Sequence, residues 1–207
     1  MLTHIKPLDD FLSLNTFLSQ HGKRFVYDKK KKIICSGNEF NELVFVIKTG
    51  AVSLHRDENI LIGIAKAPVI IGLSGCALRN KVNYSLMTAG PCTGYYLSSS
   101  LASAILDENS LWRSAFHWLA WQNSVLESRD CLLASSNSYE KIRATLLSMN
   151  EWDESLRMQI GVMNYIHQKT QVSRSVVAEI LSALRKGGYI VMDHGKLIDI
   201  IRLPAVY

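Results

Sequence analysis

Two side chains near the C-terminus have the chemistry needed to read the edges of DNA bases. Arg174 can donate two hydrogen bonds to guanine O6 and N7, and Glu179 can accept one from the N4 amino group of cytosine. Lys196, further along, can meet a phosphate. The alternative for Glu179 is a surface ion pair with Arg185 or Lys186. The candidate DNA-binding residues are Ser173, Arg174, Ser175, Val176, Glu179, Lys169 and Lys196.

A helix-turn-helix would present these side chains, because the N-terminal residues of its second helix contact base edges in the major groove. Residues 163–169 predict a first helix, Thr170-Gln171-Val172 a tight turn, and Ser173 the N-cap of a second helix. His167 replaces a small residue and Gln171 the usual turn glycine, so the second helix could be offset. The residues expected to be buried between the helices are Ile166, Val172, Val177 and Ile180.

The residues that follow predict a β-hairpin. Gly187-Gly188 ends the second helix, 189–192 and 197–201 are strand-like, and 193–196 form the turn between them. Together these elements make a winged helix. Of the net charge of +5, residues 157–202 contribute +4, from seven Lys and Arg against three Asp and Glu. Such a surplus favours binding to phosphates, the alternative being a merely basic surface.

The composition excludes several classes of protein. With 207 residues, 48% of them hydrophobic, and with 12 Gly and 4 Pro, the chain is neither collagen-like nor disordered. The apolar stretches at 60–64 and 67–73 are far shorter than the ~20 residues that span a bilayer. Lys6 and Pro7 interrupt any signal-peptide core. We therefore expect a cytoplasmic protein with no membrane partner.

The N-terminal half predicts a β domain behind a short helix. Apolar residues from Leu8 to Ser19 recur with helical spacing. Between Arg24 and Leu97, short runs rich in Val, Ile, Phe and Tyr alternate with turn signals, which predicts an antiparallel sandwich or barrel. One hairpin turns at Thr49-Gly50, and the basic run at 29–32 is typical of another hairpin tip. The inward residues of the first hairpin would be Val44, Val46, Val52 and Leu54, or the opposite set.

A long helix from about residue 110 to 133 separates the two halves. Its seven-residue apolar repeat makes a seam for another helix. This seam could pack on the β domain of its own chain or on a partner subunit. A break at 135–138 serves as a hinge, and Asn137 with Glu140 caps the next helix. The candidate dimerisation residues are Leu111, Trp118, Val125 and Leu132.

This order of elements resembles the cyclic-AMP receptor and fumarate-nitrate reduction regulator (CRP/FNR) superfamily of bacterial transcription factors. The resemblance covers nearly the whole chain and is strongest over Ile166 to Ile201. It implies an α+β fold with an antiparallel β-roll of the cyclic-nucleotide-binding type at 1–109, a long dimerisation helix and hinge at 110–136, and a winged helix-turn-helix at 137–207. Within the superfamily the chain is similar to a small enterobacterial branch, which implies a link to oxidative stress.

The resemblance also implies partners. We expect a homodimer whose winged helices enter successive major grooves of double-stranded DNA, one helical turn apart, together with a contact to RNA polymerase. Members that bind cyclic nucleotides carry a glutamate for the ribose and an Arg-Ser pair for the phosphate. These positions hold Leu73 and Tyr84-Ser85, with Arg79 and Lys81 displaced into the preceding loop. We therefore expect no cyclic-nucleotide effector.

No residue pattern predicts a catalytic, cofactor or metal site. The four cysteines, Cys35, Cys76, Cys92 and Cys131, form no C-x-x-C pair, and residues 1–34 contain no cysteine cluster for iron and sulfur. We expect each cysteine to be a buried hydrophobic residue, the alternative being a redox-reactive thiolate.

Three alternatives to this interpretation remain open. A haem could be ligated by a histidine, for which the candidates are His4, His21, His55 and His117. The winged helix could bind protein rather than DNA. A cupin-type metalloenzyme is disfavoured, because His55 is the single histidine between Arg24 and Leu97. We expect a protein without enzymatic activity.

Overall fold

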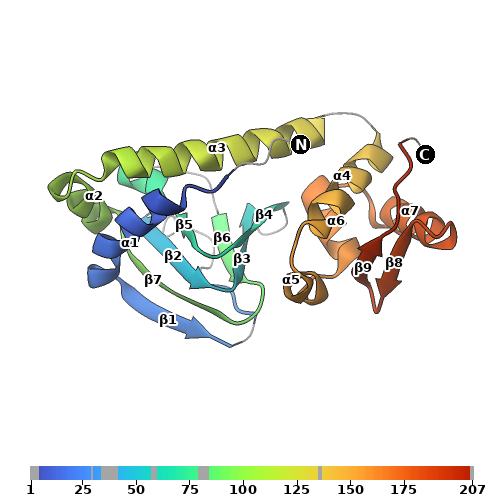
Figure 1. Ribbon diagram of the computed structural model, residues 1–207, viewed down its shortest axis with the longest axis horizontal. Helices are drawn as coiled ribbons and strands as arrows, with labels where there is room; N and C mark the ends of the chain where they lie inside the picture. Colours follow the sequence, from blue (N-terminus) through green and yellow to red (C-terminus); the bar gives the residue numbers. More distant parts are fainter. Residues whose placement is uncertain are drawn as a thin grey trace. The chain divides into compact units, whose positions relative to one another are not determined.

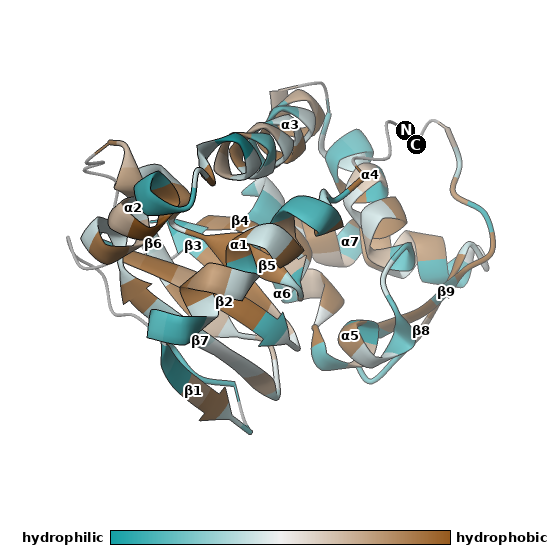
Figure 2. Ribbon diagram, turned by 60° about the vertical axis from the view of Figure 1, so that its left-hand side comes forward, coloured by the Kyte–Doolittle hydropathy of each residue, from teal (hydrophilic) through white to brown (hydrophobic). Residues whose placement is uncertain are grey.

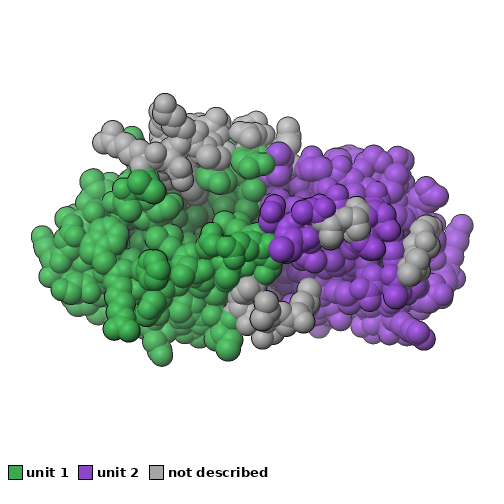
Figure 3. Space-filling view, turned by 90° about the horizontal axis from the view of Figure 1, so that it is seen from above, with its two compact units in different colours: residues 1–58, 62–128 green, residues 59–61, 129–207 purple. Residues whose placement is uncertain are grey.

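The structure is a computed structural model that describes residues 5–28, 30–33, 42–56, 60–78, 84–134 and 137–205. Its elements are labelled in Figure 1. Contacts divide the chain into unit 1, residues 1–58 and 62–128, and unit 2, residues 59–61 and 129–207 (Figure 3). The division lies inside the long helix, before the expected hinge, of which residues 135 and 136 fall outside the described part.

Two antiparallel sheets form the β domain, as the sequence predicts. The first has the strand order β1-β7-β2-β5 and the second β4-β3-β6. The strands are β1 Lys23–Tyr27, β2 Leu43–Thr49, β3 Ala51–Arg56, β4 Ile60–Lys66, β5 Val69–Ile71, β6 Tyr84–Thr88 and β7 Cys92–Ser98. A short helix, η2, spans Leu73–Cys76 after β5. The basic run falls partly outside the described residues, since Lys29 is not described.

The predicted hairpin joins β2 to β3 and needs a glycine at its turn. Gly50 has a φ of 84°, and a Cβ atom on it would lie 2.2 Å from the carbonyl oxygen of Pro91. Strand β2 is buried on both faces, because a helix packs on it as well as the rest of the β domain. The predicted inward residues therefore belong to the core, but Phe45 and Ile47 belong to it too.

Two helices cover the four-stranded sheet. Helix α1, Leu8–His21, buries Phe11, Leu14 and Leu18, and helix α2, Ser99–Glu108, buries Ala102, Ile105 and Leu106. Each fully buried leucine contributes roughly 2 kcal/mol. Ser98 caps α2, since its hydroxyl accepts a hydrogen bond from the backbone N–H of Leu101 at 3.2 Å. Figure 2 shows the hydrophobic colouring concentrated on β2 and β5.

The long helix α3, Trp112–Ala134, is anchored to strand β5. Trp118 is fully buried, and its indole N–H and the Gln122 side-chain amide both donate to the Ile70 carbonyl oxygen at 2.9 Å. Leu111 packs in the same core. Two of the four predicted seam residues, Leu111 and Trp118, are thus used inside their own unit. Val125 is exposed and Leu132 half-buried.

Unit 2 contains four helices and a hairpin within its described residues. They are α4 Ser138–Asn150, α5 Glu154–Gln159, α6 Val162–Thr170, α7 Arg174–Lys186, β8 Ile190–Asp193 and β9 Lys196–Ile200. Asn137 caps α4 as predicted, because its side chain accepts from the N–H of Glu140 at 2.9 Å. Helix α5 was not expected, since six residues are too few to show a helical period. Asp153 caps it by accepting from the N–H of Leu156 at 3.0 Å.

Candidate nucleic-acid interface

The helix-turn-helix consists of α6 and α7, joined by residues 171–173. Gln171 adopts the left-handed conformation, with φ 59° and ψ 14°, which glycine usually supplies at the end of a helix. Its backbone N–H donates to the His167 carbonyl oxygen at 2.9 Å, and its side-chain amide donates to the Gln168 carbonyl oxygen at 2.9 Å. The turn therefore closes despite the missing glycine, and α7 begins where the sequence predicts.

His167 fastens this turn to α6. Its Nδ1 lies 2.8 Å from the Val172 carbonyl oxygen, so the ring N–H must donate, because a carbonyl can only accept. The Val172 N–H donates to Thr170 Oγ1 at 3.3 Å, and that hydroxyl donates to the Ile166 carbonyl oxygen at 2.7 Å. Both backbone polar groups of Val172 are thus held just before α7. The sequence marks His167 as unusual, but no spacing rule predicts this bond.

Ser173 caps α7 as predicted. Its hydroxyl accepts from the Val176 N–H at 3.4 Å and lies 3.1 Å from the Ser175 hydroxyl. Of the residues expected to be buried between the helices, Ile166, Val177 and Ile180 are buried and Val172 is half-buried. This apolar support fixes one face of α7 and leaves the other free.

The free face of α7 presents the predicted readers. Arg174, Ser175 and Glu179 are exposed, and Val176 is half-buried. Among the residues that the structure describes, Glu179 has no ion-pair partner, so the alternative pairing with Arg185 or Lys186 is absent. Arg185, which is not among the predicted DNA-binding residues, is also exposed near the end of the helix and adds a cation to α7.

Lys169 is buried, unlike the exposed Arg174, Ser175 and Glu179, and its contact with DNA stays a prediction. The residue is 8% exposed, and its Nζ lies 5.4 Å from the centroid of the Tyr165 ring. Burial, and after it the positive charge of Arg129, lowers the pKa of Lys169 to about 8. In this arrangement the Lys169 side chain is largely shielded from solvent.

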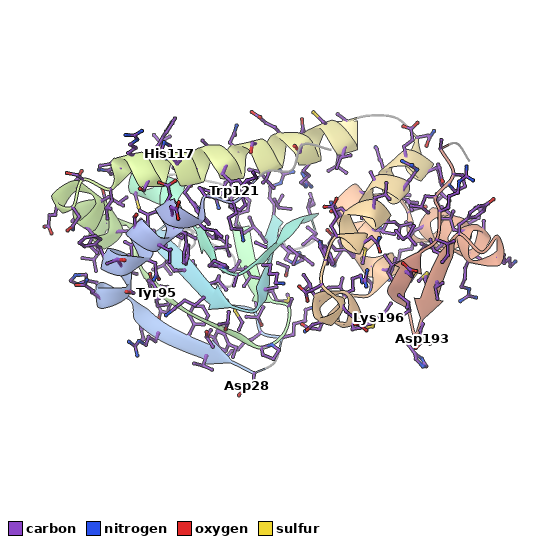
Figure 4. All side chains as sticks on the ribbon, in the orientation of Figure 1. Asp28, Tyr95, His117, Trp121, Asp193 and Lys196 are labelled. Carbon is purple, nitrogen blue, oxygen red and sulfur yellow. The ribbon has the colours of Figure 1, made fainter. Side chains whose placement is uncertain are left out.

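The wing carries the last predicted contact. The turn between β8 and β9 has His194 and Gly195 at φ 43° and 75°, the conformation typical of a tight hairpin. Figure 4 labels Asp193 and Lys196 at this turn. The Val162 N–H donates to the Gly195 carbonyl oxygen at 3.0 Å, which attaches the wing to the start of α6. Lys196 is half-buried at the first position of β9.

In unit 1, the residues at the nucleotide-binding positions are packing residues. Leu73 is buried in the same core cluster as Trp118, Ser85 is buried on β6, and Tyr84 is half-buried. A buried leucine cannot accept a hydrogen bond from a ribose hydroxyl. Arg79 and Lys81 lie outside the described residues.

The cysteines differ in exposure. Cys92 is buried and Cys76 half-buried, and burial raises the pKa of both thiols to about 11, which disfavours the reactive thiolate. Cys131 is exposed on α3, so the expectation of burial is wrong there. Cys35 lies outside the described residues.

The histidines of unit 1 that the structure describes do not converge. His55 is buried with its Nε2 3.0 Å from Ser53 Oγ, His117 lies 3.2 Å from Asp10, and His21 is exposed, while His4 lies outside the described residues. Over the described ranges, no three His, Cys, Asp or Glu residues come together as a metal site. In the same ranges no helix has the length and apolarity that a membrane span needs.

Three comparisons bear on these features. Residues 138–205 match the family of winged helix-turn-helix DNA-binding domains. The chain is 54% identical to the inhibitor of hydrogen peroxide resistance of Escherichia coli strain K12, over 100% of both chains. It resembles the c-di-GMP responsive global regulator CLP of Xanthomonas campestris with a TM-score of 0.71 and 14% identity, covering 92% of this chain and 96% of that one.

A transcriptional regulator of the CRP/FNR family from Thermus thermophilus matches with a TM-score of 0.66 and 16% identity, covering 86% of this chain and 94% of that one. The predicted fold, an antiparallel β-roll followed by a long helix and a winged helix-turn-helix, is therefore confirmed.

Proposed function

The chain belongs to the family of inhibitors of hydrogen peroxide resistance, and on that premise we propose that it is a sequence-specific transcription regulator that reads DNA with α7. One observation carries the proposal. The N-terminal part of α7 is capped by Ser173, supported from below by Val177 and Ile180, and exposes Arg174 and Glu179. Such a helix fits the major groove and offers both a donor and an acceptor to base edges.

We assign the contacts by chemistry. Arg174 pairs with guanine and Glu179 with cytosine, while Lys196 and Arg185 contact phosphates on either side. Loss of one good bidentate base contact costs about 1–3 kcal/mol of discrimination. Lys169 is left out of this set, because its ammonium would first have to leave the ring of Tyr165.

We propose that α3 pairs with a second copy through a seam shifted from the one expected. Leu119, Leu126 and Leu133 recur every seven residues, and three residues before each stand Phe116, Asn123 and Asp130. This is the seven-residue spacing of a two-stranded coiled coil, with Asn123 and Asp130 as polar positions of the seam. Phe116 is 68% and Leu126 47% exposed and Leu119 and Leu133 are half-buried, whereas Leu111 and Trp118 are buried.

We propose further that this dimer works without a cyclic nucleotide and controls genes that bear on peroxide resistance. The buried Leu73 supports the first statement, since the ribose-binding carboxylate is missing and its place is taken by core packing. The name of the relatives supports the second. Calorimetry with cyclic AMP and cyclic GMP is expected to show no micromolar binding.

Recovery of bound DNA from cells, with and without peroxide, tests the proposed function. Wild type is expected to enrich a roughly palindromic site with half-sites one helical turn apart. Arg174→Ala is expected to lose this enrichment. Arg24→Ala, which removes another exposed arginine, from β1, is the matched control and is expected to keep the enrichment. Equal enrichment by the wild type and Arg174→Ala contradicts the assignment of α7.

A second function, protein binding by the winged helix, is favoured by one surface. Tyr189, Val191 and Ile201 are all exposed on the hairpin, and the Ile201 N–H donates to the Tyr189 carbonyl oxygen, so the two residues are neighbours. This apolar patch could receive RNA polymerase or another protein. Val191→Lys is expected to abolish transcription control while leaving DNA binding intact; an equal loss of DNA binding contradicts this function.

A further inference from the structure

The joint between α6 and α7 is closed by side chains where a helix-turn-helix usually relies on a glycine. Gln171 takes up the left-handed conformation that a side chain disfavours. Something must therefore hold the backbone in this shape. Three hydrogen bonds do so. His167 Nδ1 donates to the Val172 carbonyl oxygen, the Val172 N–H donates to Thr170 Oγ1, and the Gln171 side-chain amide donates to the Gln168 carbonyl oxygen.

The bond from His167 is the one that reaches furthest toward α7. It holds the Val172 carbonyl at 2.8 Å, and Val172 precedes Ser173, the N-cap of α7. The orientation of the Val172–Ser173 peptide sets the direction in which α7 leaves the turn. Arg174 and Ser175 lie in its first turn, so any tilt at this joint displaces them from the bases they would contact.

We infer that His167 is a positioning residue for sequence recognition, acting as a hydrogen-bond donor that aims α7. This inference rests on the proposed DNA-binding function. The imidazole touches no base. It acts through Val172 and Ser173 on the side chains that do. Base contacts need accurate placement, whereas phosphate contacts depend mainly on charge, so His167 governs specificity more than overall affinity.

Two variants, whose side chains resemble each other in shape, separate the effect of the hydrogen-bond donor from the effect of losing the ring. In His167→Asn the amide nitrogen is the same number of bonds from Cα as His167 Nδ1, so the donor is kept without the ring. In His167→Leu a methyl group takes that place, at a half-buried position that tolerates it. Gln168→Ala is the control, since the side chain of this half-buried neighbour makes no hydrogen bond with a described residue.

Fluorescence anisotropy measures binding to a DNA fragment selected by the wild type from a random pool and to a scrambled fragment of equal length. His167→Leu is expected to reduce the ratio of the two affinities about tenfold, the order of one hydrogen bond. His167→Asn and Gln168→Ala are expected to stay within about twofold, and binding to the scrambled fragment to stay unchanged.

Several results would overturn the inference. The first is an unchanged ratio of affinities for His167→Leu. The second is a reduction of this ratio in His167→Asn as large as in His167→Leu. The third is that His167→Leu loses equal affinity for the selected and the scrambled fragment. Circular dichroism verifies that each variant is folded, and His167→Ala replaces His167→Leu as the donor-free variant if the latter unfolds. Failure of the wild type to select any sequence would contradict the proposed function instead, so the two failures are distinguishable.

Discussion

Lys169→Met is expected to stabilise the protein at neutral pH and to remove a pH dependence. The wild-type ammonium group is buried against Tyr165 and near Arg129, which lowers its pKa from 10.5 to about 8. A difference of this size corresponds to about 3 kcal/mol of preference for the uncharged form. The variant also loses the contact between the cation and the Tyr165 ring, which stabilises the wild type by about 1 kcal/mol. The free energy of unfolding is therefore expected to increase by about 2 kcal/mol at pH 7.5.

The sign of the pH dependence follows from proton binding. The folded protein releases the Lys169 proton near pH 8, but the unfolded chain holds it up to its ordinary pKa of 10.5. The unfolded state therefore binds more protons between these values, and stability rises with pH. The part of the penalty due to Lys169 falls from about 3 kcal/mol at pH 7.5 to about 1.4 kcal/mol at pH 9.5.

Urea unfolding of wild type and Lys169→Met at both pH values measures these quantities. Lys186→Met, which removes an exposed lysine from α7, is the control and should show no change in the difference with pH. A Lys169→Met variant less stable than wild type at pH 7.5, or a difference independent of pH, would refute the reasoning. Lys169→Met also tests the predicted contact between Lys169 and a DNA phosphate. If that contact forms, the salt dependence of DNA binding falls by about one ion in the variant.

Three further predictions concern the other described sites. Leu126→Glu is expected to yield monomers in analytical ultracentrifugation. Val125→Glu lies one residue away and outside the shifted seam, so this variant should remain a dimer. The reverse result would support the seam through Val125 that the sequence predicts. Ser173→Ala should lower the unfolding free energy by about 1 kcal/mol in urea titrations through loss of the N-cap, and no loss would mean that this cap is not used. Burial, and after it the positive charges of Lys30 and Lys32, lowers the pKa of His55. The contribution of His55 to the free energy of unfolding is therefore complete above pH 6.5 and declines as the pH falls below that value. His55→Gln should flatten this decline in acid unfolding curves, and an unaltered curve would contradict the prediction.

Local signals predicted the elements that hold the interface. The caps Asn137 and Ser173 and the turn at Gly50 each depend on a few neighbouring residues, and the structure confirms all three. Periodicity was less informative in α3. A seven-residue repeat shows that a helix is covered on one side, but not by what, and here Leu111 and Trp118 are covered by the chain's own core.

The burial of Lys169 could not be predicted from the sequence either. A lysine beside a recognition helix is expected on the surface, because isolated charges are seldom buried. Lys169 departs from this rule, since its ammonium rests on the Tyr165 ring inside unit 2. The bond from His167 to Val172 also lay beyond prediction, because the reach of a side chain to a backbone carbonyl depends on a turn whose conformation the sequence leaves open.

The central claim, that α7 reads DNA sequence, is tested most directly by pairing Arg174 with its base. Anisotropy is measured for wild type and Arg174→Ala on the selected fragment and on fragments in which each G·C pair is changed to A·T. In the wild type, one such change in each half-site is expected to weaken the free energy of DNA binding by about 1–3 kcal/mol. In Arg174→Ala the same change is expected to leave the free energy of DNA binding unchanged. Equal costs for both proteins at every position would contradict the claim.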